Sequence, residues 1–209
     1  MKLNIKNIIN TLADVRDYVF PFKKITNRFR KIDSKENLRN FIQERSAHVT
    51  QTTLYGYIKT RIGSRYAMMF EDEIFLKSIN LAKWNIYMDS IIDCTFYVFS
   101  YLLDKKNLKQ NDAEEVFLKI IEGEKKNGLE DKLFEEAKLK FNQKKQTINW
   151  QEHHQLNPFK DSGLSLYKWS PIAENLKVLD KTIVLNSMKL KWNLVENEFQ
   201  DLTKNLSFN

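Results

Sequence analysis

Turn-forming residues and cysteine are scarce in this 209-residue chain, which holds 5 Gly, 3 Pro and 1 Cys. Sheet proteins need frequent tight turns, so this scarcity favours long helices and predicts an all-α fold. A single cysteine, Cys94, excludes an intramolecular disulfide framework and a zinc site built from cysteines. Its apolar neighbours predict that it is a small buried side chain.

The usual catalytic signatures are also missing. The sequence contains no G-x-S-x-G, no P-loop, no G-x-G-x-x-G and no H-E-x-x-H. Its three histidines, His48, His153 and His154, do not form the Glu-x-x-His pairs of a ferritin-like di-iron site. His153 and His154 are adjacent and would point in different directions, so we predict a packing or surface role for them, with metal binding as the alternative. We predict no metal site and no cofactor.

A secretory signal and a membrane span are not apparent either. The first 20 residues lack an uninterrupted apolar stretch and a small-residue cleavage site. The longest apolar run, residues 90–103, is shorter than a bilayer requires and contains Asp93. We therefore predict a cytoplasmic protein.

Apolar periodicity predicts a bundle of about six helices. We expect one domain over residues 32–209, preceded by an amphipathic helix and a basic-aromatic segment over residues 1–31. Periodicity fades over residues 143–169, which predicts a long ordered loop. The central packing unit is expected to consist of three long helices, at residues 35–62, 70–103 and 171–203.

Local signals predict where these helices begin and end. Asp33 or Ser34 is suited to cap the first helix, and Gly63 stands where a helix-ending glycine is expected. Ser170-Pro171 predicts the start of the last helix, with serine as the N-cap and proline at the first helical position.

The last helix carries a broad apolar band. A core stripe is expected at Ile172, Leu176, Leu179, Ile183, Leu190 and Leu194, and further apolar residues widen it at Val184, Met188, Val195 and Phe199. The band is broad enough for the helix to contact two neighbours.

Positive charge is concentrated in the first third of the chain, although the whole chain has a net charge of only +7. Residues 1–65 hold 14 of the 34 Lys and Arg residues but only 5 of the 27 Asp and Glu residues. This asymmetry indicates an anionic partner near the N-terminus.

The basic-aromatic segment, residues 20–31, follows an apolar stripe that includes Ile5, Ile8, Leu12 and Val19. An anionic membrane surface would bind its cations while the stripe and the phenylalanines enter the interface. Nucleic acid, which would contact the same groups, is the less favoured partner. In the third interpretation the segment is a solvated connector. Its candidate anion-binding residues are Phe22, Lys23, Lys24, Arg28, Phe29, Arg30 and Lys31.

Asn85, Asp89 and Asp93 lie four residues apart in the most apolar part of the chain, so they share one face of a helix. Buried carboxylates require partners. We predict that they pair with Arg45, Arg61 or Arg65 and fix the packing of two helices. The alternative is a carboxylate pair for acid–base chemistry or cation binding.

Two blocks resemble a known family. They read HVTQTTLYGYIKTRIGSRY, continuing into MFEDEIFLKSINLAKW, and WSPIAENLKVLDKTIVLNSMKLKW. They are similar to an uncharacterised family of helical α-proteobacterial proteins, some of which carry the label "esterase". The resemblance implies a bacterial, cytoplasm-facing, mainly helical protein. No nucleophile elbow is present, so the resemblance assigns esterase activity to no residue.

Two functional classes remain open from the sequence. The favoured one is a non-enzymatic peripheral or scaffold protein that acts at the cytoplasmic membrane surface or on a protein partner. The alternative is an esterase-like hydrolase that uses polar residues around Asp89 and Asp93. An open cleft that reaches these aspartates would favour the enzyme, whereas a sealed Arg–Asp network would favour the scaffold.

Overall fold

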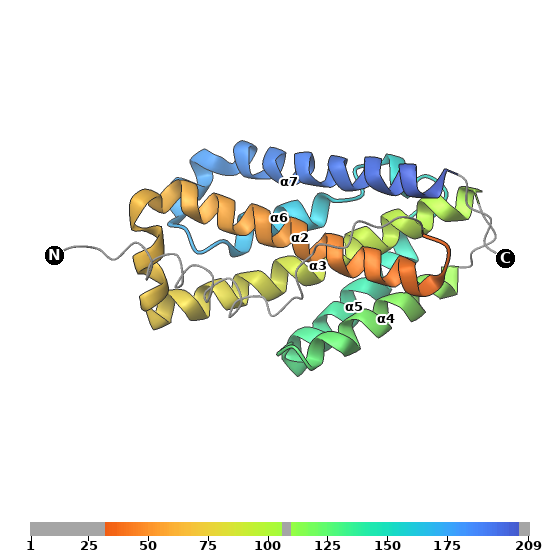
Figure 1. Ribbon diagram of the computed structural model, residues 1–209, viewed down its shortest axis with the longest axis horizontal. Coiled ribbons are helices and arrows are strands. Elements are labelled where there is room, and N and C mark those ends of the chain that lie inside the picture. The colour runs from red at the N-terminus through yellow and green to blue at the C-terminus, as the bar shows by residue number, and fades with distance from the viewer. Residues whose placement is uncertain (1–31, 106–109, 205–209) are drawn as a thin grey trace.

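The computed structural model describes residues 32–105 and 110–204, which form an all-α bundle with no strand in either range. The prediction of an all-α bundle of about six helices is confirmed. In Figure 1, α7 runs along one edge of the bundle, α3 crosses α2, and α4 and α5 lie together along the opposite edge. The helices are, in chain order, α2 (Lys35–Ile62), the 3₁₀ helix η1 (Gly63–Glu71), α3 (Glu73–Lys105), α4 (Gln110–Lys125), α5 (Asp131–Thr147), the 3₁₀ helix η2 (His153–Gln155), α6 (Lys160–Trp169) and α7 (Glu174–Thr203).

Helix α2 begins and ends at the residues that its sequence predicts. The Ser34 hydroxyl accepts a hydrogen bond from the backbone N–H of Asn37 at 3.1 Å, which satisfies one of the free N–H groups at the helix start. At the other end Gly63 has a φ of +64°, a conformation that L-residues with a side chain rarely adopt. Local sequence therefore determines both ends.

Helix α3 is the centre of the bundle, because it is buried on all sides from Ala82 to Leu102. A helix that is apolar all round can be stable only when other elements surround it. This helix has the length and apolar character of a membrane span, but its side chains are buried within the protein, as in the core helix of a soluble bundle. It begins at Glu73 rather than near Phe70, because Asp72 caps it and η1 occupies the preceding residues.

The predicted loop over residues 143–169 is wrong in two places. Helix α5 continues to Thr147, and α6 occupies the last ten residues of the range. The sequence of α6 is KDSGLSLYKW, whose Ser and Gly residues have low helix propensity. Its small buried residues, among them Ser162 and Gly163, allow α6 to pack closely, and a Cβ atom on Gly163 would lie 3.4 Å from Leu185 of α7. Tertiary packing therefore stabilises a helix that its local sequence does not predict.

Helix α7 starts three residues later than the Ser170-Pro171 pair predicts. The Ser170 hydroxyl does not cap α7 but donates to the carbonyl of Leu166 at 2.6 Å, at the end of α6. The first hydrogen bonds of α7 are instead accepted by the backbone carbonyl of Ala173, from the N–H groups of Leu176 and Lys177. The serine therefore ends one helix rather than starting the next.

The two apolar sets on α7 exchange the roles that the sequence predicts. The residues expected only to widen the band, Val184, Met188, Val195 and Phe199, are buried in the core. Four residues of the expected core stripe, Leu179, Ile183, Leu190 and Leu194, are exposed on the outer side of the helix. The helix is therefore apolar on two faces, and only one of them contacts the described part of the chain.

Candidate functional site

Two aspartates of α3 form ion pairs with two lysines of α5. Asp89 accepts from the Lys140 ammonium at 2.8 Å, and Asp93 accepts from the Lys144 ammonium at 2.5 Å. The two aspartates are four residues apart on α3, and the two lysines are four residues apart on α5. Residues at this spacing lie on one face of a helix, so one turn of α3 faces one turn of α5. The prediction that these aspartates are buried and paired is confirmed, but the prediction that arginines pair with them is wrong.

Asp93 also caps the N-terminal end of α6. Its second carboxylate oxygen accepts from the backbone N–H of Ser162 at 2.8 Å, where a helix N-terminus attracts negative charge. The side chain is completely buried, and this burial raises the pKa of Asp93 to about 6, whereas Lys144 and the Ser162 N–H act to lower it. Asp93 thus joins α3, α5 and α6 at one point.

Lys144 bridges two carboxylates. Its ammonium lies 2.5 Å from Asp93 and 2.8 Å from Asp161 in the first turn of α6. Burial acts to lower the pKa of Lys144, but the two carboxylates outweigh it and raise the pKa above its ordinary value. The lysine therefore stays protonated at neutral pH and cannot serve as a general base.

A cleft of about 580 Å³ lies beside this network, between α3, α5 and α6. Asp89 and Lys144 line it, together with Ser165 of α6. The Ser165 hydroxyl is buried and has no hydrogen-bond partner within the described residues. The cleft is thus open at Asp89, while Asp93 is sealed.

The arginines predicted to pair with Asp89 and Asp93 connect α2 to α7 instead. Arg45 donates two hydrogen bonds of 2.6 Å to Glu198, and Arg61 pairs with the buried Asp180. Tyr57 also donates to Asp180 at 2.9 Å. The two clamps lie near opposite ends of the antiparallel α2–α7 contact and fix its register.

Two further residues of the predicted polar cluster lie outside the network. Asn85 donates to the carbonyl of Leu81 in its own helix at 2.8 Å. Arg65 is exposed in η1. The predicted six-residue cluster therefore divides into an aspartate–lysine network, two arginine clamps and two separate residues.

His153 and His154 pack against aromatic side chains of α3, whereas His48 lies on α2 beside Arg45 and Glu198. The ring of His153 lies edge-on to Phe96, with 6.0 Å between ring centroids, and burial lowers the pKa of His153 to about 4. His154 contacts the Ser100 hydroxyl through its Nδ1 atom at 3.0 Å. Within residues 32–105 and 110–204, no group of three or more His, Cys, Asp or Glu side chains could hold a metal ion.

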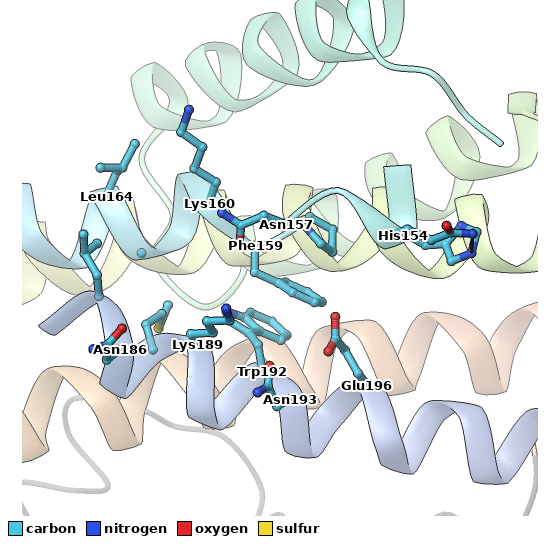
Figure 2. A pocket seen from close by; sticks show the side chains of 15 residues that line it. His154, Asn157, Phe159, Lys160, Leu164, Asn186, Lys189, Trp192, Asn193 and Glu196 are labelled. Carbon is cyan, nitrogen blue, oxygen red and sulfur yellow. Dashed lines mark hydrogen bonds between the residues drawn. The ribbon is translucent and has the colours of Figure 1, made fainter. Parts of the chain in front are cut away.

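A groove of about 690 Å³ lies between α7 on one side and α6 with the residues that precede α6 on the other. Figure 2 shows Phe159 and Trp192 at its centre, and the two rings stack with centroids 4.1 Å apart. The Trp192 indole N–H donates to Ser162 at 3.1 Å, which holds the stack in place. Asn186 and Asn193 of α7 line the groove, and both are exposed.

The outer side of α7 carries a row of four exposed aliphatic side chains. We call it the α7 ridge; it consists of Leu179, Ile183, Leu190 and Leu194, which are 75%, 68%, 65% and 64% exposed. At about 100° per residue the four side chains lie within an arc of roughly 60°. The centre of the buried face lies roughly 140° away around the helix. Scattered exposed aliphatic residues need no explanation, but four of them on one face of a helix indicate an interaction surface.

Residues 1–31, which include the basic-aromatic segment, lie outside the described residues, so their predicted role on an anionic surface stays a prediction. No family model, curated protein or solved structure matches this chain. The resemblance to the α-proteobacterial family likewise stays a prediction, and the function has to be inferred from the geometry.

Sequence reasoning missed three groups that the structure brings together. The pair Lys140 and Lys144 repeats the i,i+4 spacing of the aspartates, and that shared spacing could have identified the partner helix. Nothing local identifies Ser165. Nothing local identifies the buried Glu124 either, which accepts from Gln43 at 2.7 Å and Tyr87 at 2.8 Å.

Proposed function

We propose that this protein is a non-enzymatic helical scaffold, which binds a protein partner through the α7 ridge. The observation that carries this proposal is the ridge itself, because four large aliphatic side chains stay exposed in one row while the opposite face of the same helix is buried. The partner that fits is an amphipathic helix with an apolar stripe of the same period, laid along the row.

The charged side chains between the helices support a scaffold, because they form ion pairs and hydrogen bonds with one another within the protein. Asp93 is held by Lys144 and by the α6 N-terminus, and Arg45 and Glu198 satisfy each other. Such pairs determine which helices pack together and in which register. Acid–base chemistry would need an acid or base that is accessible to a substrate, and Asp93 is completely buried. Asp89 does line the cleft, but Lys140 already holds it in an ion pair.

The cleft with Ser165 favours the alternative, a hydrolase. A serine nucleophile needs a neighbouring base. Three lysines line this cleft, Lys140, Lys144 and Lys168. Lys140 and Lys144 are held in ion pairs with the aspartates of α3, and the carboxylates beside Lys144 raise its pKa. No histidine lines the cleft among the described residues. A fluorophosphonate probe should therefore label no serine stoichiometrically. Labelling that disappears in Ser165→Ala, or on mutation of His48, His153 or His154, would establish the hydrolase and overturn the scaffold.

The positive test uses a synthetic helical peptide of unrelated sequence that carries leucines at the spacing of the ridge. We expect saturable binding to the full chain, measured by fluorescence anisotropy. Leu190→Asp should abolish binding, whereas Leu139→Asp, a change at an exposed leucine of α5, should leave it unchanged. Equal binding to Leu190→Asp and Leu139→Asp would contradict a ridge that binds helices, and so would the absence of binding to the parent chain at concentrations at which that chain is monomeric.

A further inference from the structure

We propose that the partner helix on the α7 ridge is α7 of a second copy of this chain, packed antiparallel about a two-fold axis. This inference rests on the proposed function and adds the identity and the geometry of the partner. It is carried by the spacing of the ridge, by the polar residues that border it, and by the groove beside it.

The spacing of the ridge reads the same in both directions along α7. Leu179 and Ile183 are four residues apart, Ile183 and Leu190 are seven apart, and Leu190 and Leu194 are four apart. A two-fold axis between residues 186 and 187 therefore places Leu179 of one copy opposite Leu194 of the other, and Ile183 opposite Leu190. A two-fold interface requires a surface that is complementary to itself, and this arrangement of aliphatic side chains has that property.

The residues at the centre of the ridge permit close approach of two helices. Ser187 is small and half-buried, and its hydroxyl donates to the carbonyl of Val184 in its own helix at 2.9 Å. No large side chain therefore stands at the crossing point between the two pairs of aliphatic residues. Helices whose contact residues are small approach each other to the short end of the usual range of about 8–10 Å.

Exposed neutral side chains border the ridge on one side. An amide both donates and accepts hydrogen bonds, so a row of asparagines can pair with its own copy. A shortage of charge is typical of the centre of a protein interface, whereas a helix that lies on a membrane carries a polar face rich in Lys and Arg. These neutral side chains suit a protein partner, and the charged residues Lys160, Lys189 and Glu196 lie beyond them in the groove between α6 and α7. The members of the neutral border are Asn175, Thr182, Asn186, Asn193 and Asn197.

The groove between α6 and α7 extends this surface. Asn186 and Asn193, which border the ridge, also line this groove (Figure 2). The ridge alone exposes about 300 Å² of apolar surface, taking roughly 100 Å² for a whole aliphatic side chain. A stable interface buries about 800 Å² on each partner. The walls of the groove, including the exposed Leu164 of α6, can supply the additional contact.

Sedimentation velocity on the full chain over a range of concentrations tests the inference. We expect a reversible dimer with a dissociation constant near or below about 10 µM. Ile183→Asp and Leu190→Asp should each raise that constant by more than about tenfold, because each places a charge opposite the same row of aliphatic residues. Leu139→Asp serves as the matched control and should leave it unchanged. Circular dichroism should show that all three variants fold, since the altered side chains are exposed.

Three outcomes would overturn the inference. If the chain stays monomeric at about 100 µM but still binds the synthetic helix, the second copy is wrong and the proposed function stands. If the chain is monomeric and does not bind the helix, both proposals fail. If the ridge variants abolish binding to phosphatidylcholine vesicles while the parent chain stays monomeric, the ridge is a lipid-binding surface.

Cross-linking tests the antiparallel arrangement. One chain carries Leu179→Cys and another carries Leu194→Cys. In an antiparallel dimer, two copies of the same variant hold their new thiols roughly 22 Å apart, too far for a disulfide, whereas mixing brings the two different positions together. We therefore expect a disulfide-linked dimer after mild oxidation of the mixture and little from either variant alone. Efficient cross-linking of each variant with itself would instead indicate parallel helices.

Discussion

Replacing Asp93 by alanine should destabilise the protein far more than replacing Asp89, although the two residues share one face of α3. Asp93→Ala leaves the Lys144 ammonium in a mostly buried position beside Asp161 alone, and it removes the cap of α6. Stranding one member of a buried ion pair costs about 3–5 kcal/mol, and losing an N-cap costs about 1 kcal/mol.

Asp89 pairs with Lys140, whose side chain is 50% exposed, so solvent screens that pair. Exposed pairs contribute about 0–1 kcal/mol. The structure therefore predicts a difference of about 3–6 kcal/mol between Asp93→Ala and Asp89→Ala. For a chain of this length, a loss of about 4 kcal/mol corresponds to a melting temperature lower by about 8–16 °C.

Urea denaturation of the parent chain and the two variants measures the difference, with equal m-values as the condition for comparing midpoints. A double-mutant cycle with Lys144→Ala should give a coupling energy of about 2 kcal/mol or more, since the two groups are in contact. If the two aspartate variants lie within about 1 kcal/mol of each other, the three-helix role of Asp93 is wrong.

Two further predictions concern acid stability and the N-terminal segment. Because the pKa of His153 is about 4 in the folded chain and about 6.5 in an unfolded one, unfolded chains bind a proton first as the pH falls. Between pH 6.5 and 4 the parent chain should therefore lose about 1–2 kcal/mol of unfolding free energy relative to His153→Phe, once solvent screening of this partly exposed ring is allowed for. The raised pKa of Asp93 acts in the opposite direction over the same pH range, but it does so in both chains, so the difference between their urea titrations isolates the effect of His153. If residues 1–31 bind an anionic surface, the full chain should sediment with vesicles rich in anionic lipid at low salt and be released at high salt, whereas a chain that starts at residue 32 should stay in the supernatant in both. Equal recovery of both chains in the supernatant would contradict membrane binding by this segment.

Much of the fold follows from local sequence. Ser34 and Gly63 determine the ends of α2, because a cap and a positive φ each depend on a few consecutive residues. The apolar character of α3 on all sides predicts its central position, and the four-residue spacing of Asp89 and Asp93 places them on one face. Scarce glycine and proline already predict long helices.

The candidate site depends on contacts between residues distant in the chain. Asp89 and Asp93 pair with lysines 51 residues further along the chain rather than with arginines. They do so because α5, which carries these lysines, packs against the face of α3 that carries the aspartates. Helix α6 forms where periodicity is weak, since Asp93 of α3 caps it and α7 packs against its small residues. On α7 both faces are apolar, so periodicity alone cannot determine which one is buried. That choice depends on where α2 and α6 lie, because the side of the helix that they cover becomes core and the α7 ridge is left at the surface.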